Sequence, residues 1–247
     1  MHVVVTGAGT GIGLAIAERL HRDGATLSLM ARDHARLSTV AAPLGATALR
    51  CDIREQAQVD EAFAAAADRH GPINVLVANA GIGGGNAAGE GDRYEDLVAT
   101  NLVGTYRCLR AAQRHLAEAP EPRHFVVTAS ILARIAVPGY TGYSASKAGL
   151  LGLVRSLAAE LGGDDIPVNA ICPGWVDTTM AWEGIDGMAQ ADGITREAAY
   201  ARAMEAVPLG RMSRPADIAG VVAWLLSPDA RGVTGQAIDV NGGAFMH

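Results

Sequence analysis

Lysine is almost absent from this chain. Its 247 residues include 20 basic side chains, of which only Lys147 is a lysine and all the others are arginines. The two cations are not equivalent, because an ammonium is a compact point charge on a flexible stem and a guanidinium is a broad planar fork. A lone lysine can be an ordinary surface residue of a helix. We interpret Lys147 instead as a position where arginine would not serve, and hence as a functional residue.

Cysteine and long apolar runs are also scarce, and these absences exclude several classes of protein. The three cysteines are odd in number and widely spaced, which argues against a disulfide framework or a zinc ribbon. They are Cys51, Cys108 and Cys172. No charged leader precedes a long apolar stretch, and no run approaches the roughly 18 apolar residues of a membrane span. We therefore expect a cytoplasmic protein whose thiols are reduced and buried.

Charge of one sign is not concentrated anywhere in the chain. The formal net charge is −6, and the sequence contains no block of like charges. A general affinity for nucleic acid or for an anionic membrane is therefore not expected. The 49% of apolar residues are enough to bury a large core. We expect one domain over residues 1–247.

Short β-rich runs alternate along the chain with longer segments rich in alanine and leucine. The expected strands are His2–Thr6, Thr26–Ala31, Thr47–Cys51, Val75–Asn79, His124–Ala129, Pro167–Cys172 and Ala237–Val240. The expected helices are Gly13–Arg22, Gln56–Asp68, Tyr94–Leu116, Tyr143–Leu161, Arg196–Ala206 and Pro215–Leu226. This alternation predicts an α/β fold, a doubly wound parallel sheet of the Rossmann type with about seven strands and helices on both faces.

Two stretches interrupt this alternation. Gly81–Gly91 is rich in glycine and follows an expected strand, and Asp177–Thr195 is a long irregular stretch that carries Trp182. Ligands of open α/β sheets bind beyond the C-terminal ends of the strands, where both stretches belong. We predict that residues 177–210 form a lid over the substrate.

A cluster of glycines joins the first strand to the first helix. Glycines permit a tight turn and a close approach of the backbone to a pyrophosphate, and the helix N-terminus supplies free N–H groups. Taken alone, such a cluster can be a structural turn. At the first strand–helix junction of an α/β chain it predicts a dinucleotide site, formed by Thr6, Gly7, Gly9, Thr10, Gly11, Ile12 and Gly13.

The end of the second strand indicates which cofactor is used. Enzymes that use NAD place an acid there to hold the ribose diol, whereas an arginine accommodates a 2′-phosphate. The usual place of the acid holds Ala31, and Arg32 follows it. The sequence therefore favours NADP(H) over NAD(H). Asp33 would undo this inference if its carboxylate turned inward.

Tyr143 and Lys147 stand four residues apart, so on a helix they share one face. A cation beside a phenol favours the phenolate and lowers the pKa of the phenol from its free value of about 10. Such a phenol can donate and accept a proton near neutral pH. The pair therefore indicates acid/base catalysis.

Together with these features, further motifs give the whole chain a resemblance to the short-chain dehydrogenase/reductase family. Ser130 lies thirteen residues before Tyr143 in the sequence. The other motifs are Cys51-Asp52-Ile53, Asn79-Ala80-Gly81, Asn101-Leu102-Val103-Gly104, Pro173-Gly174 with Val176 and Thr178, Thr234-Gly235-Gln236 and Asn241-Gly242-Gly243. Two departures are minor: Ala78 replaces an asparagine that often precedes Asn79, and Asn241 replaces the usual aspartate of the final motif.

The resemblance implies a role for each matching residue. Tyr143 would exchange the proton with the substrate oxygen, Ser130 would hydrogen-bond the same oxygen, and Lys147 would hold the nicotinamide ribose and lower the pKa of the phenol. Asn101 would anchor a water that links Lys147 to solvent. The remaining cofactor contacts would come from Asp52, Ile53, Asn79, Ala80, Gly81, Pro173, Gly174, Val176 and Thr178.

The reaction implied is reduction of a ketone to a secondary alcohol. Gly83-Gly84-Gly85 and Ile194–Arg211 are similar to segments of bacterial polyketide and acyl ketoreductases, which favours a 3-oxoacyl or polyketide-like substrate. The stretch from Asp177 to Val207 contains six acidic residues and only two arginines. This excess of negative charge argues against a substrate attached to a carrier protein. The alternatives are oxidation of a secondary or cyclic alcohol with NAD(P), and a nucleotide-binding regulator without catalysis.

A homo-oligomer is also expected. Tyr94–Leu116 and Tyr143–Leu161 carry apolar residues on more than one face, and Gly149 and Gly152 would allow close approach of another helix. Packing within one subunit is the other explanation of this pattern. We expect a dimer or a tetramer.

Overall fold

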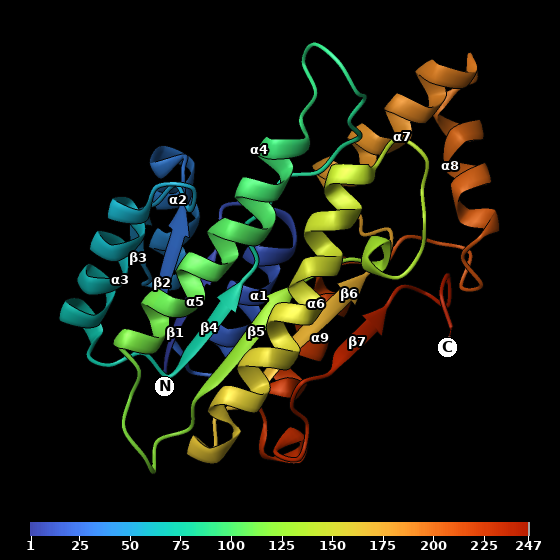
Figure 1. Cartoon of the computed structure of the whole chain (residues 1–247). Helices are drawn as coiled ribbons and strands as arrows, with labels where there is room; N and C mark the ends of the chain where they lie inside the picture. The colour runs from blue at the N-terminus through green and yellow to red at the C-terminus, as the bar shows by residue number, and fades with distance from the viewer. Residues whose placement is uncertain (247) are drawn as a thin grey trace.

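A seven-stranded parallel sheet forms the centre of the computed structural model, which describes residues 1–246 (Figure 1). The strand order is β3-β2-β1-β4-β5-β6-β7. The strands are β1 (His2–Thr6), β2 (Thr26–Ala31), β3 (Thr47–Arg50), β4 (Val75–Ala78), β5 (His124–Thr128), β6 (Val168–Pro173) and β7 (Ala237–Val240). The predicted fold and its seven strands are therefore confirmed.

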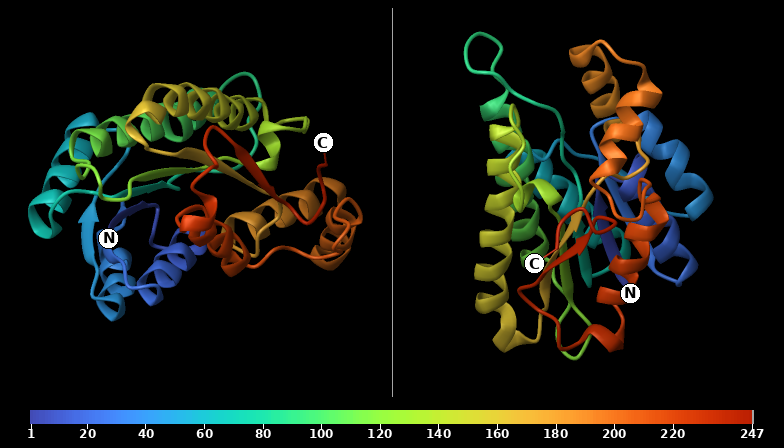
Figure 2. Two further views of the ribbon diagram at one scale, coloured as in Figure 1. Left: turned by 90° about the horizontal axis from the view of Figure 1, so that it is seen from below. Right: turned by 90° about the vertical axis from the view of Figure 1, so that its right-hand side faces the viewer.

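Two layers of helices cover the sheet, one on each face (Figure 2). One layer holds α3 (Gln56–His70), α4 (Tyr94–Val98), α5 (Thr105–Arg114) and α6 (Thr141–Leu161). The other holds α1 (Gly11–Arg22), α2 (His34–Ala41) and α9 (Pro215–Leu225). Because both faces are covered, the central strands are apolar throughout, and Val3, Val4 and Val5 have no exposed surface.

One predicted helix, Tyr94–Leu116, is broken. A π-helical turn, Ala99–Gly104, separates α4 from α5. Gly104 lies against Ile53 so closely that a Cβ on Gly104 would stand 2.7 Å from Ile53 Cγ1. The turn also directs the Asn101 side chain into the protein, where it is fully buried.

The predicted irregular stretch Asp177–Thr195 was wrong, because most of it is helix. Helix α7 spans Thr179–Asp192, the Thr178 hydroxyl accepts a hydrogen bond from the Ala181 N–H at its start, and Gly193 ends it at a φ of 63°. The hairpin continues into α8 (Arg196–Glu205). Figure 1 shows both helices standing beyond the C-terminal ends of the strands. That the segment acts as a lid stays a prediction.

The hairpin of α7 and α8 has its own small core and cross-links. The rings of Trp182 and Tyr200 are stacked 5.6 Å apart, and the Arg196 guanidinium lies 5.6 Å from the Trp182 ring. Ion pairs join Arg196 to Asp186 and Arg202 to Asp192. These contacts hold the hairpin together as one body above the sheet.

The three cysteines are buried free thiols. In the described part of the chain, no helix has both the length and the apolar character that a membrane span requires.

The connection order of the sheet creates a crevice at its upper edge. From β1 the sheet first grows on one side, with β2 and then β3. The chain then crosses back, and β4 pairs with the other side of β1. Ligands bind at such a reversal point, outside the carboxyl ends of the strands. The glycine turn after β1 and the glycine-rich stretch after β4 both lie at this edge.

Candidate active site

Ser130, Tyr143 and Lys147 come together beyond the ends of β5 and β6. Ser130 follows β5 and is 6% exposed, while Tyr143 and Lys147 occupy successive turns of α6. The Lys147 ammonium lies 5.7 Å from the centre of the Tyr143 ring and donates to the Thr128 carbonyl oxygen at 2.8 Å. The structure thus gives one cluster of two hydroxyls and one amine.

The Ser130 hydroxyl caps a short helix and also lies beside Tyr143. Its hydroxyl oxygen accepts the Leu132 N–H at 3.1 Å and so begins the short helix Ile131–Ala133. The Ser130 hydroxyl is also within hydrogen-bonding reach of Tyr143, where it acts to lower the pKa of the phenol. A substrate oxygen placed between the two would receive hydrogen bonds from both.

The predicted lowering of the Tyr143 pKa by Lys147 was wrong for this structure. Burial raises the pKa of Tyr143 above its ordinary value, and Ser130 offsets only part of this. Burial also lowers the pKa of Lys147 to about 8. The reason is that both groups lose water, and the ammonium points to the Thr128 carbonyl instead of the phenol oxygen.

Asn101 joins the loop after β4 to helix α6. Its side-chain oxygen accepts the Ile82 N–H at 2.8 Å, and its amide nitrogen donates to the Ile82 carbonyl at 3.0 Å. The same nitrogen donates to the Ser146 hydroxyl at 3.1 Å. Both side-chain hydrogens of Asn101 are therefore taken by protein groups, and the predicted water would use its side-chain oxygen or its backbone.

Asn79 connects the predicted dinucleotide turn to the catalytic cluster. Its amide nitrogen donates to the carbonyls of Thr6 and Gly7 at 3.2 and 3.3 Å. Its oxygen accepts from the Thr128 hydroxyl at 3.2 Å, and the Thr128 carbonyl in turn holds Lys147. The Thr6 hydroxyl accepts the N–H groups of Asn79 and Ala80, both at 3.1 Å.

The glycine turn has the geometry that a pyrophosphate requires. Gly7 and Gly11 adopt φ values of 66° and 55°, which favour glycine, and a Cβ on Gly13 would stand 2.3 Å from the Gly7 oxygen. Thr10 begins α1 without a side-chain cap, and the first turn of α1 carries no acid. The N–H groups at this N-terminus thus have no side-chain partner, and a phosphate group fits them.

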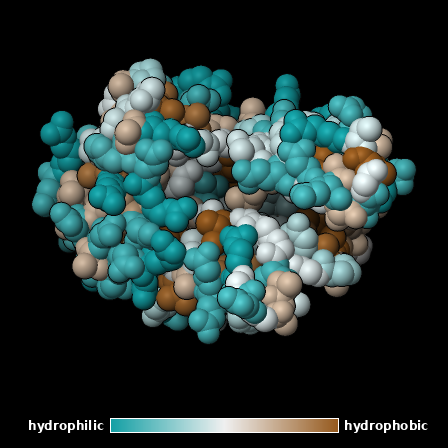
Figure 3. Space-filling model, turned by 90° about the horizontal axis from the view of Figure 1, so that it is seen from above, coloured by the Kyte–Doolittle hydropathy of each residue, from teal (hydrophilic) through white to brown (hydrophobic). Residues whose placement is uncertain are grey.

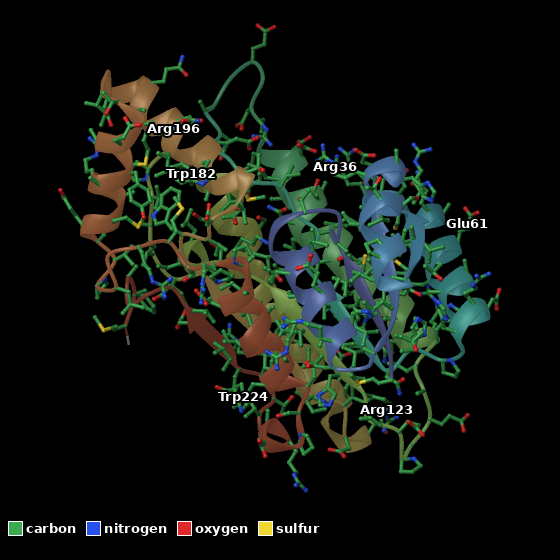
Figure 4. The ribbon with its side chains drawn as sticks, turned by 180° about the vertical axis from the view of Figure 1, so that it is seen from behind. Arg36, Glu61, Arg123, Trp182, Arg196 and Trp224 are labelled. Carbon is green, nitrogen blue, oxygen red and sulfur yellow. The ribbon has the colours of Figure 1, made fainter. Side chains whose placement is uncertain are left out.

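The residues predicted to select the cofactor lie beside the same turn. The Asp33 side chain accepts the Arg36 N–H at 3.0 Å and caps helix α2, so this carboxylate does not make the inward turn that would undo the NADP(H) inference. Arg32 is exposed, and a Cβ on Gly9 would lie 3.9 Å from the Arg36 side chain. Figure 4 shows Arg36 at this upper edge of the molecule. Arg36 therefore lies against the glycine turn, and Arg32 directly follows Ala31, whose Cβ lies 4.0 Å from the Cβ position of Gly9.

Asp52 and Ile53, predicted to meet adenine, are held in different ways. The Arg54 guanidinium forms an ion pair with the Asp52 carboxylate at 2.7 Å. The hydrogen bonds from Arg54 hold the pKa of Asp52 below its ordinary value. Arg54 also reaches Asp96 at 3.1 Å. Ile53 is 5% exposed and packs its side chain against Gly104. A contact of Ile53 with adenine would therefore use its backbone.

The segment after β6 brings its predicted cofactor residues to the glycine turn. The Thr178 methyl lies 3.1 Å from where a Cβ on Gly11 would stand. Val176 is 4% exposed, and its carbonyl oxygen accepts the Thr178 hydroxyl at 3.2 Å. Pro173 is the last residue of β6, and Gly174 packs against Asn241, whose Cβ lies 2.9 Å from the Cβ position of Gly174.

A cavity of about 640 Å³ opens beside this segment, and Gly11, Thr178, Trp182 and Arg196 are among its lining residues. Figure 4 shows Trp182 and Arg196 together on the hairpin. Figure 3, which looks down on the C-terminal ends of the strands, shows the surface hollowed near its middle. Ser130 and Tyr143 do not line this cavity, which adjoins the cofactor turn.

The hairpin also contacts the glycine-rich loop after β4. Met180 is 46% exposed, yet its sulfur lies 2.8 Å from where a Cβ on Gly83 would stand. On the other side of this loop, a Cβ on Gly85 would lie 2.8 Å from the Gly139 oxygen. The loop is thus enclosed between α7 and the segment that leads to Tyr143, and side chains there would displace one or the other.

Sequence reasoning missed Thr128 and Ser146, and it did not predict the contact of Met180 with Gly83. Thr128 acts through its backbone oxygen, which carries no residue-specific signal. Met180 reaches Gly83 only because α7 folds back over the sheet. Ser146 stands directly before Lys147, and this position on a helix with two functional residues was the one available signal.

Comparison with known proteins finds similarity along nearly the whole chain. The family described as enoyl-(acyl carrier protein) reductase matches residues 7–245. The chain is 33% identical to the 3-oxoacyl-[acyl-carrier-protein] reductase MabA of Mycobacterium tuberculosis over 246 residues, which cover 99% of this chain and 92% of that protein. It is similar to proteins of this reductase type along essentially its whole length.

Two solved structures share the fold at comparable identity. A variant of actinorhodin polyketide ketoreductase, solved with NADPH, superposes with a TM-score of 0.93 at 36% identity and covers 98% of this chain and 96% of its own. A 3-ketoacyl-(acyl-carrier-protein) reductase from Brucella melitensis, solved with NADH, gives a TM-score of 0.87 at 31% identity, with 99% and 98% covered.

Proposed function

Because this chain belongs to the short-chain dehydrogenase/reductase family of oxidoreductases, we propose that it reduces a ketone to a secondary alcohol with NADPH. The observation that carries the proposal is the cluster of Ser130, Tyr143 and Lys147. It combines two hydroxyls that can meet one substrate oxygen with the only lysine of the chain.

The residues around the crevice fit a dinucleotide with a 2′-phosphate. Gly7, Gly11 and the start of α1 would hold the pyrophosphate, Arg32 and Arg36 the 2′-phosphate, and Lys147 the nicotinamide ribose. When bound, the cofactor supplies the hydride. The side chains of the protein must supply the remaining requirements of the reaction.

The protein must orient the carbonyl and deliver one proton to its oxygen. The Ser130 hydroxyl would donate to this oxygen and stabilise its developing negative charge. The phenol of Tyr143 is protonated at neutral pH, because burial raises its pKa, and so can donate. Lys147, held by the Thr128 carbonyl with its ammonium 5.7 Å from the centre of the Tyr143 ring, would relay a proton back to the phenolate left behind.

The substrate proposed is a 3-oxoacyl thioester or a polyketide-like β-ketone. The names of the similar reductases support this class. The acidic residues of the predicted lid argued from the sequence against a carrier-bound substrate. In the structure this argument is weaker, because several of the carboxylates have partners. Asp186 and Asp192 are paired with arginines, and Asp177 accepts the Trp182 indole N–H at 2.7 Å.

The experiment is a panel of ketones followed by NADPH consumption at 340 nm. It contains β-ketoesters, 3-oxoacyl thioesters and cyclic diketones, and the alcohol formed is identified by chromatography. We expect turnover of at least one open-chain β-ketone. Turnover only of secondary or cyclic alcohols with NADP⁺ or NAD⁺ would establish the oxidative alternative instead.

Cofactor choice gives a separate prediction. We expect the wild-type protein to use NADPH at least about tenfold more efficiently than NADH, because Arg32 and Arg36 pair with the 2′-phosphate. Arg32→Ala should lower kcat/KM for NADPH by about tenfold and leave the value for NADH nearly unchanged. The matched control is Arg155→Ala on α6, far along the chain from this turn. A wild-type preference for NADH would refute the argument from Arg32.

The same proposal includes a homo-oligomer in the cytoplasm. Buried free thiols suit a reducing compartment. Gly149 packs within the subunit, where its Cβ position lies 2.8 Å from Leu102, but nothing stands near the Cβ position of Gly152. Exposed Val103 and Tyr106 on the neighbouring segment add apolar surface that a second copy would cover. Light scattering of the purified protein measures whether a dimer or a tetramer forms.

A further inference from the structure

Ser146 lies between Asn101 and the catalytic helix and has no exposed surface. Its hydroxyl accepts the Asn101 amide at 3.1 Å and donates to the Tyr143 carbonyl oxygen at 2.7 Å. It is therefore the one described side chain that hydrogen-bonds both Asn101 and the backbone of Tyr143. Lys147 follows it directly in the sequence.

The three bonds of Asn101 depend on one another. One amide hydrogen goes to the Ile82 carbonyl and the other to Ser146, while the oxygen holds the Ile82 N–H. Without the Ser146 oxygen, one buried N–H would lose its acceptor, and the amide would turn to find another. Turning would weaken the hold on Ile82 and on the backbone of the neighbouring Gly81.

Gly81 lies where this movement would reach the catalytic amine. A Cβ on Gly81 would stand 3.0 Å from the Asn101 oxygen and 3.5 Å from the Lys147 nitrogen. The loop after β4 thus lies against both the Asn101 side chain and the Lys147 amine. At Ile82 the loop is joined to α6 through Asn101 and Ser146, and further along the same loop the Asn86 side chain accepts the Gly142 N–H at 2.8 Å.

We propose that Ser146 is a positioning residue for ketone reduction, which clamps Asn101 and the loop at Ile82 to the turn of α6 that carries Tyr143 and Lys147. This inference rests on the proposed function for its kinetic consequence and on the hydrogen bonds alone for its structural one. Ser146 itself contacts neither substrate nor cofactor.

The kinetic test replaces Ser146 by alanine and measures kcat and KM separately. We expect kcat to fall about tenfold to hundredfold while KM for the ketone changes little, because misplaced groups slow the chemical step. In a double-mutant cycle, Ser146→Ala should cost little more in the Asn101→Ala background, since the two residues act through one connection. Ser146→Cys, with a weaker donor and acceptor, should lose less than Ser146→Ala.

The matched control is Ser144→Ala on the same helix. The Ser144 hydroxyl is buried and has no hydrogen-bond partner among the described residues. Its removal should leave kcat and KM at their wild-type values. Additive losses in the double-mutant cycle, or equal losses in Ser144→Ala and Ser146→Ala, would overturn the proposal.

Hydrogen exchange gives a readout that does not need activity. In Ser146→Ala the amide of Ile82 should exchange roughly tenfold faster, because its acceptor is loosened, and Ser144→Ala should not change it. Unchanged exchange at Ile82 in a folded Ser146→Ala or Ser146→Cys protein would overturn the proposal. If no ketone is reduced by the wild-type protein, the proposed function fails, and the exchange experiment still decides the role of Ser146.

Discussion

Replacing Tyr143 by phenylalanine should lower kcat/KM for ketone reduction by about a thousandfold, the range of a positioned general acid. The ring keeps its packing in this variant, and only the hydroxyl that donates the proton is lost. The melting temperature should stay close to that of the wild type, and NADPH affinity should change by no more than about tenfold, the value of a hydrogen bond. Steady-state rates at 340 nm and fluorescence titration of NADPH measure the two effects.

Tyr140→Phe is the control for this variant. The Tyr140 ring lies edge-on to Tyr143, with 6.5 Å between the ring centres, and belongs to the same segment. We expect this variant to keep most of its activity, because the proposed proton transfer uses only Tyr143. A similar loss in both variants would show that the tyrosine cluster acts by packing.

Replacing Lys147 by arginine should lower kcat/KM by at least about a hundredfold although it keeps the positive charge. Lys147 is 5% exposed, and its ammonium fits between the Thr128 carbonyl and Gly81. A planar guanidinium is too broad for that place. Lys147→Met, which keeps the stem and removes the charge, should lose as much or more.

The reverse substitution on the same helix is the control for Lys147. Arg155→Lys exchanges the same two cations at an exposed position of α6, and we expect its activity to equal that of the wild type. Wild-type activity in Lys147→Arg would contradict our interpretation of the single lysine, because arginine would then serve at this position.

The pH dependence of the reduction follows from the lysine. Burial lowers the Lys147 pKa to about 8, so the amine is charged below this pH and neutral above it. We expect kcat/KM for the ketone to be level between about pH 6 and 7.5 and to fall as the pH rises through 8, because the neutral amine has no proton to relay to the phenolate. A profile that rises steadily from pH 7 to 9 would contradict this assignment.

The sequence predicted the features that depend on local pattern or short spacing. The apolar strands, the glycine turn and the Tyr143–Lys147 pair each lie within a few residues of chain, and their order defined the sheet and the crevice. Arg32 could likewise be placed by its distance from the turn. Even the cap at Asp33 was readable in principle, since aspartate at a helix start commonly caps the third following N–H.

The features that the sequence did not predict depend on tertiary contacts. Asn101 and Ser146 are 45 residues apart and meet only because a π-helical turn points the asparagine inward. The spacing of Tyr143 and Lys147 placed them on one face, but it carried no information on burial, which dominates both of their pKa shifts. Helix α7 was missed because its glycines and mixed faces weaken the helical pattern.

Single-turnover reduction measured by stopped flow tests most directly whether the Tyr143 phenol donates the proton. Wild-type and Tyr143→Phe proteins are saturated with NADPH and mixed with saturating ketone, so that binding and product release do not limit the rate. The account predicts a rapid loss of absorbance at 340 nm in the wild type and a loss about a thousandfold slower in the variant. Equal rates in the two proteins would contradict it.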